Sequence, residues 1–453
     1  MTLHHPEEWD QRPDKPGVNG RAALAFIFFT VLLDTMAFGM VAPVLPRLVA
    51  QLIDTPRITA HLQHISPRLA HRFSADAVSA AAAIYGLFNT VFAVMQFFFS
   101  PMIGSLSDRF GRRPLILASN LGLGLNYALM TWAPNLGWLF LGRTISGITG
   151  ASFGIASAYI ADVTAPEKRA AAFGVLGAAF GVGFVIGPAL GGWLGEFGPR
   201  LPFLVAGGFS LANVCYGLFV LPESLPRGSR TGFSWRRANP VGALVMLRRH
   251  PELLALSGVT LLSNLAQVSL PSVVVLYATH RYGWSPLTIG VTLGMVGIAL
   301  IAVQVGVVGR FTARFGPRVA LVTGLSFGTV GLLYAGLAPT GPLFWLGIPV
   351  IALWGMAGAA AQGLMTRHVG RSEQGQLQGA STSLTGIAEL IGPAVFTLTF
   401  AYFVGHGKPL AWSGAPFVLA SALLAVATVW AWLATRSPPH LDSPGQGDCD
   451  DAC

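Results

Sequence analysis

Twelve long apolar runs constrain the fold of this chain more than any other feature. A helix needs roughly 20 mostly apolar residues to cross roughly 30 Å of hydrocarbon, and each run is long enough. The composition agrees, since 53% of the residues are hydrophobic and only 10% are charged. The sequence therefore predicts an all-α integral membrane protein with twelve transmembrane helices. The runs begin near Ala22, Ser79, Pro114, Leu136, Ala170, Leu201, Leu253, Pro286, Arg318, Pro342, Gln378 and Trp412.

The placement of the positive charges predicts the orientation of the chain. Of 28 Lys and Arg residues, 20 lie in the termini and one set of alternating loops, seven lie in the other set, and Arg143 lies inside a span. Cytoplasmic loops carry such an excess of Lys and Arg. We therefore expect a multi-pass protein of the inner membrane with both termini in the cytoplasm. The placement of the net charge of +9 is that of a positive-inside membrane protein, so the lipid bilayer, and no nucleic acid, is expected as a partner.

An internal repeat divides the chain into two halves. A shift of 205 residues lays "GSLSDRFGRR" at 104–113 over "GRFTARFGPR" at 309–318, and Gly187-Pro188 over Gly392-Pro393. Duplicated halves with a site between them are typical of secondary transporters. The predicted domains are a cytoplasmic N-terminal tail (1–21), a first six-helix bundle (22–221), a cytoplasmic linker (222–252), a second six-helix bundle (253–435) and a cytoplasmic C-terminal tail (436–453).

The charged stretch at 104–113 separates the second and third apolar runs and predicts a gating latch. Asp108 can meet a helix N-terminus, and its neighbouring guanidinium groups can meet carboxylates or helix C-termini. Asp162 ends the fourth span on the same side and is the predicted partner of Arg109. Simple anchoring by positive charge is the alternative. The predicted latch consists of Gly104, Asp108, Arg109, Gly111, Arg112, Arg113 and Asp162.

Three motifs resemble those of the major facilitator superfamily. "GSLSDRFGRRP" resembles its signature loop between spans two and three, "GRTISGITG" at 142–150 its fourth-span motif, and "GVGFVIGPALGG" at 181–192 its antiporter motif. The stretches "LDTMAFGMVAPVLPRL" and "EQGQLQGASTSLTG" narrow the resemblance to tetracycline/proton antiporters among the twelve-span drug:proton antiporters. The antiporter motif comprises Gly183, Gly187, Pro188, Gly191 and Gly192.

This resemblance implies a fold and a function. The fold is two pseudo-symmetric six-helix bundles, and the function is alternating access with proton-coupled antiport. The substrate would be an exported amphipathic organic compound, with tetracycline-type drug efflux included. Small glycines allow the fifth span to approach a neighbouring helix closely, which is also what ordinary helix packing requires.

Three positions depart from the tetracycline antiporters that the sequence resembles. Asn126 stands where they carry a membrane Asp, Leu300 where they carry a His, and Gly328 where they carry another Asp. These departures leave open whether tetracycline is a substrate and which residues couple transport to protons.

Three ionisable residues lie inside predicted spans and are candidates for proton coupling: Asp34, Arg143 and Glu389. Each such residue costs roughly 2.5–3.5 kcal/mol on insertion scales, so it is a functional hypothesis by default. The resemblance implies that Asp34 and Arg143 face each other, and a static structural pair is the alternative. Glu389, one turn before the Gly392-Pro393 break, is a candidate for a relocated protonation site. The alternative is a residue that faces a watery cytoplasmic cavity.

Four neutral polar residues inside spans are candidates to line the substrate cavity: Gln96, Asn126, Gln267 and Gln304. They can orient a ligand without the cost of a buried charge. Polar residues in spans also hold helices together, and each of the four has that alternative.

No cofactor or metal is expected, and the chain is not expected to be an enzyme. His61, His64 and His71 in the long first outside loop lack a Cys or carboxylate at metal-ligand spacing, as do Cys449 and Cys453 in the tail. No nucleotide-binding loop and no nucleophile paired with a base can be recognised.

Two functional alternatives remain beside proton-coupled export. One is a proton symporter for uptake of a small metabolite, and the other is a receptor that resembles a transporter. The expected partners are a small organic substrate, protons and lipid, and the protein is expected to be a monomer.

Overall fold

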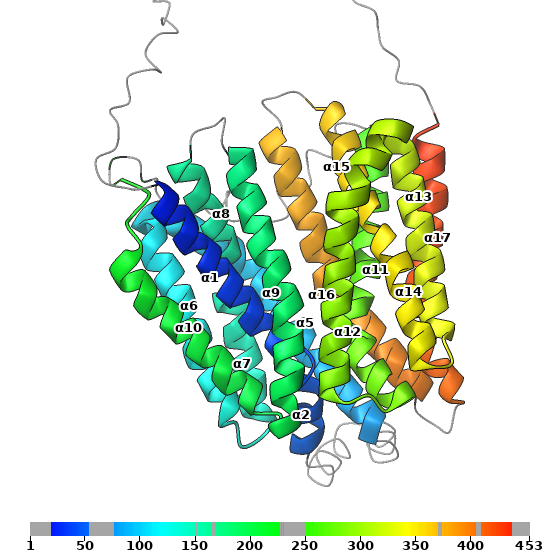
Figure 1. Ribbon diagram of the computed structural model, residues 1–453, viewed down its shortest axis with the longest axis horizontal. Coiled ribbons are helices and arrows are strands. Elements are labelled where there is room, and N and C mark those ends of the chain that lie inside the picture. The colour runs from blue at the N-terminus through cyan, green and yellow to red at the C-terminus, as the bar shows by residue number, and fades with distance from the viewer. Residues whose placement is uncertain are drawn as a thin grey trace, which may run out of the picture.

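The computed structural model describes residues 20–53, 77–150, 152–164, 169–226, 228, 230, 251–369, 374–404 and 409–436, and these residues form helices and no strands (Figure 1). Most of each predicted tail, the histidines of the first outside loop and most of the linker lie outside the described residues. The helices of the first half are α1 (Gly20–Val41), α2 (Leu45–Leu52), α5 (Ala77–Phe110), α6 (Arg112–Thr131), α7 (Leu136–Thr149), α8 (Ser152–Val163), α9 (Arg169–Phe197) and α10 (Leu201–Val220). Those of the second half are α11 (Pro251–Tyr282), α12 (Pro286–Val303), η5 (Gln304–Val308), α13 (Gly309–Leu337), α14 (Gly341–Leu353), α15 (Gly355–Arg367), α16 (Gln374–Val404), η6 (Leu410–Gly414) and α17 (Ala415–Ala434).

The described helices are long and apolar enough for a membrane protein. Nine segments satisfy length and composition for a span, or ten if the bent pair α1–α2 counts as one. One of them, Pro286–Leu337, has 52 residues. At about 1.5 Å per residue this segment is about twice as long as a bilayer core is thick. It bends at Gly316, so it provides two crossings. The 20-residue α6 is also long enough, and the arrangement is consistent with twelve crossings.

The internal repeat is visible in the backbone. Gly111 separates α5 from α6 with φ 107° and ψ 159°, and Gly316 bends α13 with φ 81° and ψ 160°. Both values lie in a region that favours glycine. The two glycines are 205 residues apart, which is the offset found in the sequence. In each half a single glycine therefore changes the direction of the chain between two helices. Most of the charged stretch at 104–113 is helical.

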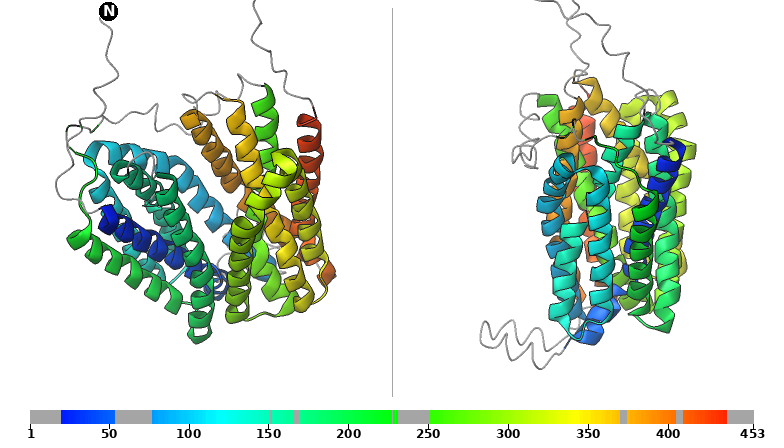
Figure 2. Two further views of the ribbon diagram at one scale, coloured as in Figure 1. Left: turned by 45° about the horizontal axis from the view of Figure 1, so that its top comes forward. Right: turned by 90° about the vertical axis from the view of Figure 1, so that its left-hand side faces the viewer.

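Figure 2 shows the two halves side by side, and two pairs of helices make most of the contact between their described residues. In the first pair, α5 packs against α16, where Gly86 lies so close to Thr397 that any Cβ would overlap its hydroxyl. In the second pair, α9 packs against α12, where a Cβ at Gly290 would overlap the carbonyl oxygen of Pro188. The 205-residue shift maps α5 onto α12 and α9 onto α16. The two contacts are therefore related by the pseudo-symmetry of the repeat.

The predicted antiporter motif of α9 contacts two helices. On one face, a Cβ at Gly183 would lie 2.8 Å from Cβ of Thr35, and one at Gly187 would lie 2.7 Å from the carbonyl oxygen of Met36. Both neighbours belong to α1, and so does Met40, whose backbone Gly191 touches. On the other face, Gly192 touches Pro286 of α12. Small residues thus bring α9 into backbone contact with both its own bundle and the other one.

The contact between α9 and α12 runs from Gly192 and Pro286 to Gly181 and Ile301, and it does not reach the start of α9. A Cβ at Gly174 or Gly177, near the start of α9, would meet no other described atom within 4 Å. The same is true of Gly306, just beyond the end of α12. The start of α9 lies toward the side of the molecule where α1 begins and α17 ends, at the top of Figure 1. The two halves are therefore in contact at the opposite end and separated at this one.

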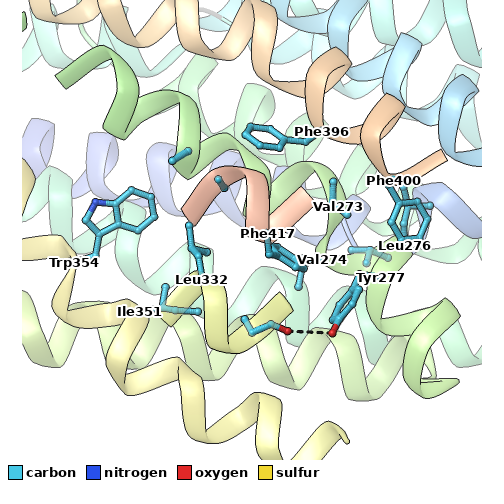
Figure 3. Close-up of a cluster of buried hydrophobic side chains, with 14 of the residues drawn as sticks. Val273, Val274, Leu276, Tyr277, Leu332, Ile351, Trp354, Phe396, Phe400 and Phe417 are labelled. Carbon is cyan, nitrogen blue, oxygen red and sulfur yellow. Dashed lines mark hydrogen bonds between the residues drawn. The ribbon is translucent and has the colours of Figure 1, made fainter. Parts of the chain in front are cut away.

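Buried aromatic residues fix the second half (Figure 3). The ring of Tyr277 packs edge-on against Phe417, with 5.1 Å between the centroids. Its hydroxyl donates to the carbonyl of Ala335 at 3.0 Å, so this buried polar tip is satisfied. Trp354, at the junction of α14 and α15, donates from Nε1 to Ser263 of α11 at 3.1 Å. These contacts join α11, α13, α15 and α17 into one unit.

The close contact at Gly290 leads to a prediction about stability. Replacing Gly290 with Ala puts a methyl group against the backbone of Pro188, so the helices must move apart. Overpacking of this kind costs about 1–3 kcal/mol. We expect a lower melting temperature for the purified protein in detergent, measured by intrinsic fluorescence. Gly177→Ala, on open space in α9, is the control, and equal melting temperatures for the two variants would contradict the backbone contact.

Candidate functional site

A buried arginine lies at the centre of the first bundle. Arg143 of α7 is only 6% exposed. Its Nη2 donates to Oδ1 of Asn89 at 2.9 Å, and its guanidinium carbon lies 4.4 Å from the ring centroid of Phe92. A buried charge requires polar or aromatic partners of this kind. Both partners belong to α5, so α5 holds the guanidinium in place.

The sequence of α5 explains how it presents these partners. Asn89, Phe92 and Gln96 are three and four residues apart and so share one face of the helix. That face packs on α7, where Gly147 lies against the backbone of Phe92. Gln96 is half-buried there, with Nε2 3.5 Å from the carbonyl oxygen of Gly150. In this structure Gln96 therefore joins two helices, as in the packing alternative.

Asp34 lies in the same region of the first bundle. It is half-buried on α1, which α9 holds through the glycine contacts. Phe38 of α1, one turn after Asp34, has its ring centroid 6.1 Å from that of Phe92, the ring that lies against the guanidinium of Arg143. The helices α1 and α7 therefore both contact this part of α5. That Asp34 and Arg143 form a pair stays a prediction.

Asn126 is placed in a helix interface. Its side chain is 1% exposed, and its Nδ2 donates to Oγ of Ser146 on α7. The same amide lies 3.7 Å from the sulfur of Met130. These contacts correspond to the packing alternative, and they leave the side chain of Asn126 almost no exposed surface.

Gln267 and Gln304 are exposed, unlike the other two candidate cavity residues. Gln304 begins the five-residue π-helix η5 at the end of α12. Such local widening of a helix is frequent at functional sites. Gln267 lies on α11 one turn from Pro271, whose carbonyl oxygen lies 3.5 Å from the hydroxyl of Tyr85 on α5. That contact crosses between the halves, so Gln267 lies on the side of α11 that faces the first bundle.

Glu389 is the central residue of the 31 in α16, and it is exposed. The contacts of neighbouring residues on the same face of α16 show which helices Glu389 faces. Thr385, one turn before it, accepts a hydrogen bond from Asn264 of α11 at 3.0 Å. Gly386 lies against the ring of Phe97 on α5, where a Cβ would lie 2.7 Å from Cδ2. Glu389 therefore lies on the face of α16 between α11 of its own half and α5 of the other.

The apolar exposed residues of α16 lie on its other side. Ile391 is 47% exposed and Leu398 57%. At 100° per residue they lie about 160–200° around the helix from Glu389. Such a stripe is what lipid would cover. The exposure of Glu389 is thus toward the interior between the two bundles.

The predicted latch residues form an ionic network at one end of the first bundle. The guanidinium of Arg112 contacts Asp108 at 2.7 Å, Asp162 at 3.2 Å and the hydroxyl of Ser107 at 2.5 Å. The network joins the end of α5, the start of α6 and the end of α8. Arg113 extends it to α10 by donating to the carbonyl of Leu218 at 2.6 Å.

The start of the linker belongs to this network. The backbone N–H of Arg112 donates to Oε1 of Glu223 at 2.8 Å, so the carboxylate caps the N-terminus of α6. Oε2 of Glu223 lies 3.9 Å from the guanidinium of Arg230. Ser224 donates to Asp162 at 3.1 Å. Gly111 must be glycine for two reasons, because its φ is positive and because a Cβ would overlap Glu223.

The partner of Asp162 differs from the prediction. Arg112 occupies that place, and Arg109 is exposed, with its guanidinium 5.2 Å above the ring of Phe110. Gly104 is half-buried, with no other described atom within 4 Å of an added Cβ. In the second half Ala313 stands where the first half has Asp108. Among the described residues of that half, no counterpart of this ionic network is seen.

Sequence reasoning missed two residues that the structure brings into these sites. Asn89 was detectable, because it lies seven residues before Gln96 on the polar face of the second span. Glu223 was assigned to a linker, although it follows directly on the sixth span as an acid in "LPES". No spacing in the sequence links it to Gly111, which is 112 residues earlier.

The chain matches the family model described as Major Facilitator Superfamily over residues 27–393. It is 35% identical over 393 residues to the tetracycline resistance protein, class C, of Escherichia coli, covering 86% of this chain and 92% of that protein. It is 31% identical over 412 residues to the class G protein of Vibrio anguillarum, covering 89% and 95%.

A solved structure has the same fold. The human organic anion transporter MFSD10 (TETRAN) superposes with a TM-score of 0.65 at 23% identity, and the match covers 92% of this chain and all of that one. At this identity the similarity concerns the fold alone.

The network around Arg112 predicts a difference between two neighbouring arginines. Arg112→Gln leaves Asp108 and Asp162 without their shared cation, whereas Arg109→Gln removes only an exposed contact with Phe110. Hydrogen bonds to charged groups contribute about 1.5–3 kcal/mol each. We expect Arg112→Gln to lower the melting temperature and Arg109→Gln to leave it within a degree or so of wild type. The opposite ranking would show that Arg109 is the partner of Asp162.

The contact of Asn89 with Arg143 predicts a second difference within α5. Asn89→Leu removes the acceptor of the buried guanidinium, and an unpaired buried charge is costly. Thr90→Val is the control, since Thr90 donates only to the carbonyl of Gly86 in its own helix. We expect Asn89→Leu to reduce transport in reconstituted vesicles at least tenfold, and Thr90→Val to change it little. Equal rates would mean that Asn89 does not support Arg143.

Proposed function

Since this chain belongs to the Major Facilitator Superfamily and is a multi-pass membrane transporter, we propose that it exports an amphipathic organic compound in exchange for protons. The observation that carries this proposal is the position of two carboxylates deep within helices that are built to cross a membrane. Asp34 lies within α1, and Glu389 is the central residue of α16. Carboxylates at such positions are costly, and those that occur inside spans mark substrate pathways or proton relays.

The two carboxylates can carry protons in different halves of the molecule. Asp34 lies one turn from Phe38, whose ring is 6.1 Å from that of Phe92 beside Arg143, so movement of the guanidinium would change the tendency of Asp34 to bind a proton. Glu389 lies on the interior face of the second bundle, toward the first. In this proposal Arg143 modulates Asp34, and Glu389 is the protonation site of the second half.

The departures from the tetracycline resistance proteins support a role for Glu389. Gly328 has no room for a carboxylate, because a Cβ there would lie 2.7 Å from Cγ of Trp354 and 2.8 Å from Cδ1 of Leu424. Leu300 cannot bind a proton. Glu389 is thus the one acidic side chain that the described spans of the second half offer for coupling.

The arrangement of the halves supports alternating access. They are in contact where α9 meets α12 and separated at the end where α1 begins and α17 ends. If that end is cytoplasmic, as the positive charges predict, this conformation is open to the cytoplasm. An exporter in this state takes up its substrate, and rocking about the glycine contacts then opens the opposite end. We propose a monomer in the inner membrane with both termini in the cytoplasm.

The names of the relatives indicate a drug-like organic compound as the class of substrate. Proteins with 29–35% identity are named for tetracycline resistance, which makes tetracycline the first compound to test. Uptake of a small metabolite by symport and a receptor role are the alternatives. Proteoliposomes with an internal pH-sensitive dye distinguish them. An exporter moves protons in exchange for added compound, a symporter moves protons in the same direction as the compound, and a receptor moves none.

Asp34→Asn is the test of the coupling site in the first bundle. The amide keeps the shape of the side chain but cannot carry a proton at neutral pH. We expect at least a hundredfold loss of substrate-driven proton flux in proteoliposomes, with an unchanged elution profile of the purified protein. Glu196→Gln is the matched control, because Glu196 is an exposed carboxylate at the outer end of α9 that accepts from the N–H of Leu287. Wild-type flux in Asp34→Asn would remove Asp34 from the coupling mechanism.

A further inference from the structure

Glu389 is an isolated negative charge in the second bundle. From Leu253 to Thr435 the sequence contains two acidic residues, Glu373 between spans and Glu389. Within the described part of the chain, Glu389 makes no ion pair and no hydrogen bond through its side chain. Asp108 and Asp162, by contrast, both form ion pairs with Arg112.

The helices packed against α16 bring no cation to Glu389. Their charged groups lie near helix ends, and α17 has none. The titratable residues on these helices are Asp108, Arg109 and Tyr85 on α5, Glu252, Tyr277, His280, Arg281 and Tyr282 on α11, and Arg367 on α15. Glu389 is fifteen residues from either end of α16. A cation for this carboxylate must therefore come from outside the protein.

An aromatic and a neutral polar residue lie within about one helical turn of Glu389. Phe97 of α5 lies against Gly386, one turn before Glu389. Gln267 of α11 lies at the same level, because Asn264 contacts Thr385 one turn below and Val268 contacts Gly392 one turn above. Gln267 and Glu389 are both exposed. The site thus offers one negative charge, one ring and one amide from three helices and both halves.

A carboxyl group at this depth is stabilised either by taking up a proton or by pairing with a cation. An aromatic ring nearby favours an organic cation, because the ring quadrupole attracts positive charge. We propose that Glu389 binds the cationic group of the substrate directly, with Phe97 against its apolar body, and that the proton and the substrate compete for this one carboxylate. The substrate class is a monovalent amphipathic organic cation. This inference rests on the proposed function and specifies its substrate site.

An anionic substrate is disfavoured by the same geometry. Arg143 is 6% exposed, and its guanidinium is occupied by Asn89 and Phe92. No other basic residue lies in the interior of a described span. An anion would meet Glu389 without a compensating cation. Competition at one carboxylate also makes the exchange obligatory, because bound substrate and bound proton exclude each other.

Equilibrium binding of tetraphenylphosphonium to the full-length protein in detergent tests this inference without a proton gradient. If the cation displaces one proton, its affinity falls about tenfold for each unit of decreasing pH while Glu389 is protonated. Glu389→Gln should weaken binding at least tenfold and remove the pH dependence, and Glu389→Asp should retain both in part. Tetraphenylborate has the same shape and the opposite charge, and it should not compete. Phe97→Leu should weaken binding severalfold with the pH dependence intact.

The outcomes separate this inference from the proposed function. Equal binding of tetraphenylphosphonium by wild type and Glu389→Gln, or no binding by wild type, overturns the cation site. Tetracycline-driven proton flux that depends on Asp34 would still uphold the proposed function. Conversely, binding that depends on Glu389 without proton flux for any compound would support the site and overturn the antiporter. Binding that depends on Glu389 but not on pH would overturn the competition with protons.

Discussion

Backbone contact at glycine is the interaction on which this arrangement of helices depends. Inside a membrane, apolar side chains gain little by leaving lipid for a helix interface, so association relies on close packing. Here α9 touches α1 through Gly183, Gly187 and Gly191, and it touches α12 through Gly192. One helix therefore belongs to the core of its own bundle and to the contact with the other. Larger side chains at these positions would separate both pairs.

Two features of the sequence, its apolar runs and its internal repeat, made much of the fold predictable. The 205-residue offset predicted two related halves, and the positive-φ glycines Gly111 and Gly316 are related by that offset. The motif at 181–192 indicated a closely packed helix. What the sequence could not show is that the motif has two neighbours, because that depends on how the bundles are placed against each other.

The sequence predicted which residues could form the candidate sites, but it did not predict in which direction around its helix each side chain points. Arg109 and Arg112 are three residues apart, which on a continuous helix would place them on one face. The positive φ of Gly111 ends α5 and begins α6, so Arg112 points to Asp162 and Arg109 does not. Similarly, nothing in the sequence distinguishes Asn126, buried against Ser146, from the exposed Gln267. Only the direction of each side chain around its helix separates packing from a possible ligand contact.

The contacts of Glu223 show that the first residues of the predicted linker belong to the first bundle. Its carboxylate fixes the chain to the start of α6 and to Arg230, so the segment after α10 moves with the first bundle as far as Arg230. Twenty residues then remain before Pro251. The part of the chain that connects the two bundles is therefore shorter than the predicted linker of residues 222–252, because its first residues belong to the ionic network of the first bundle.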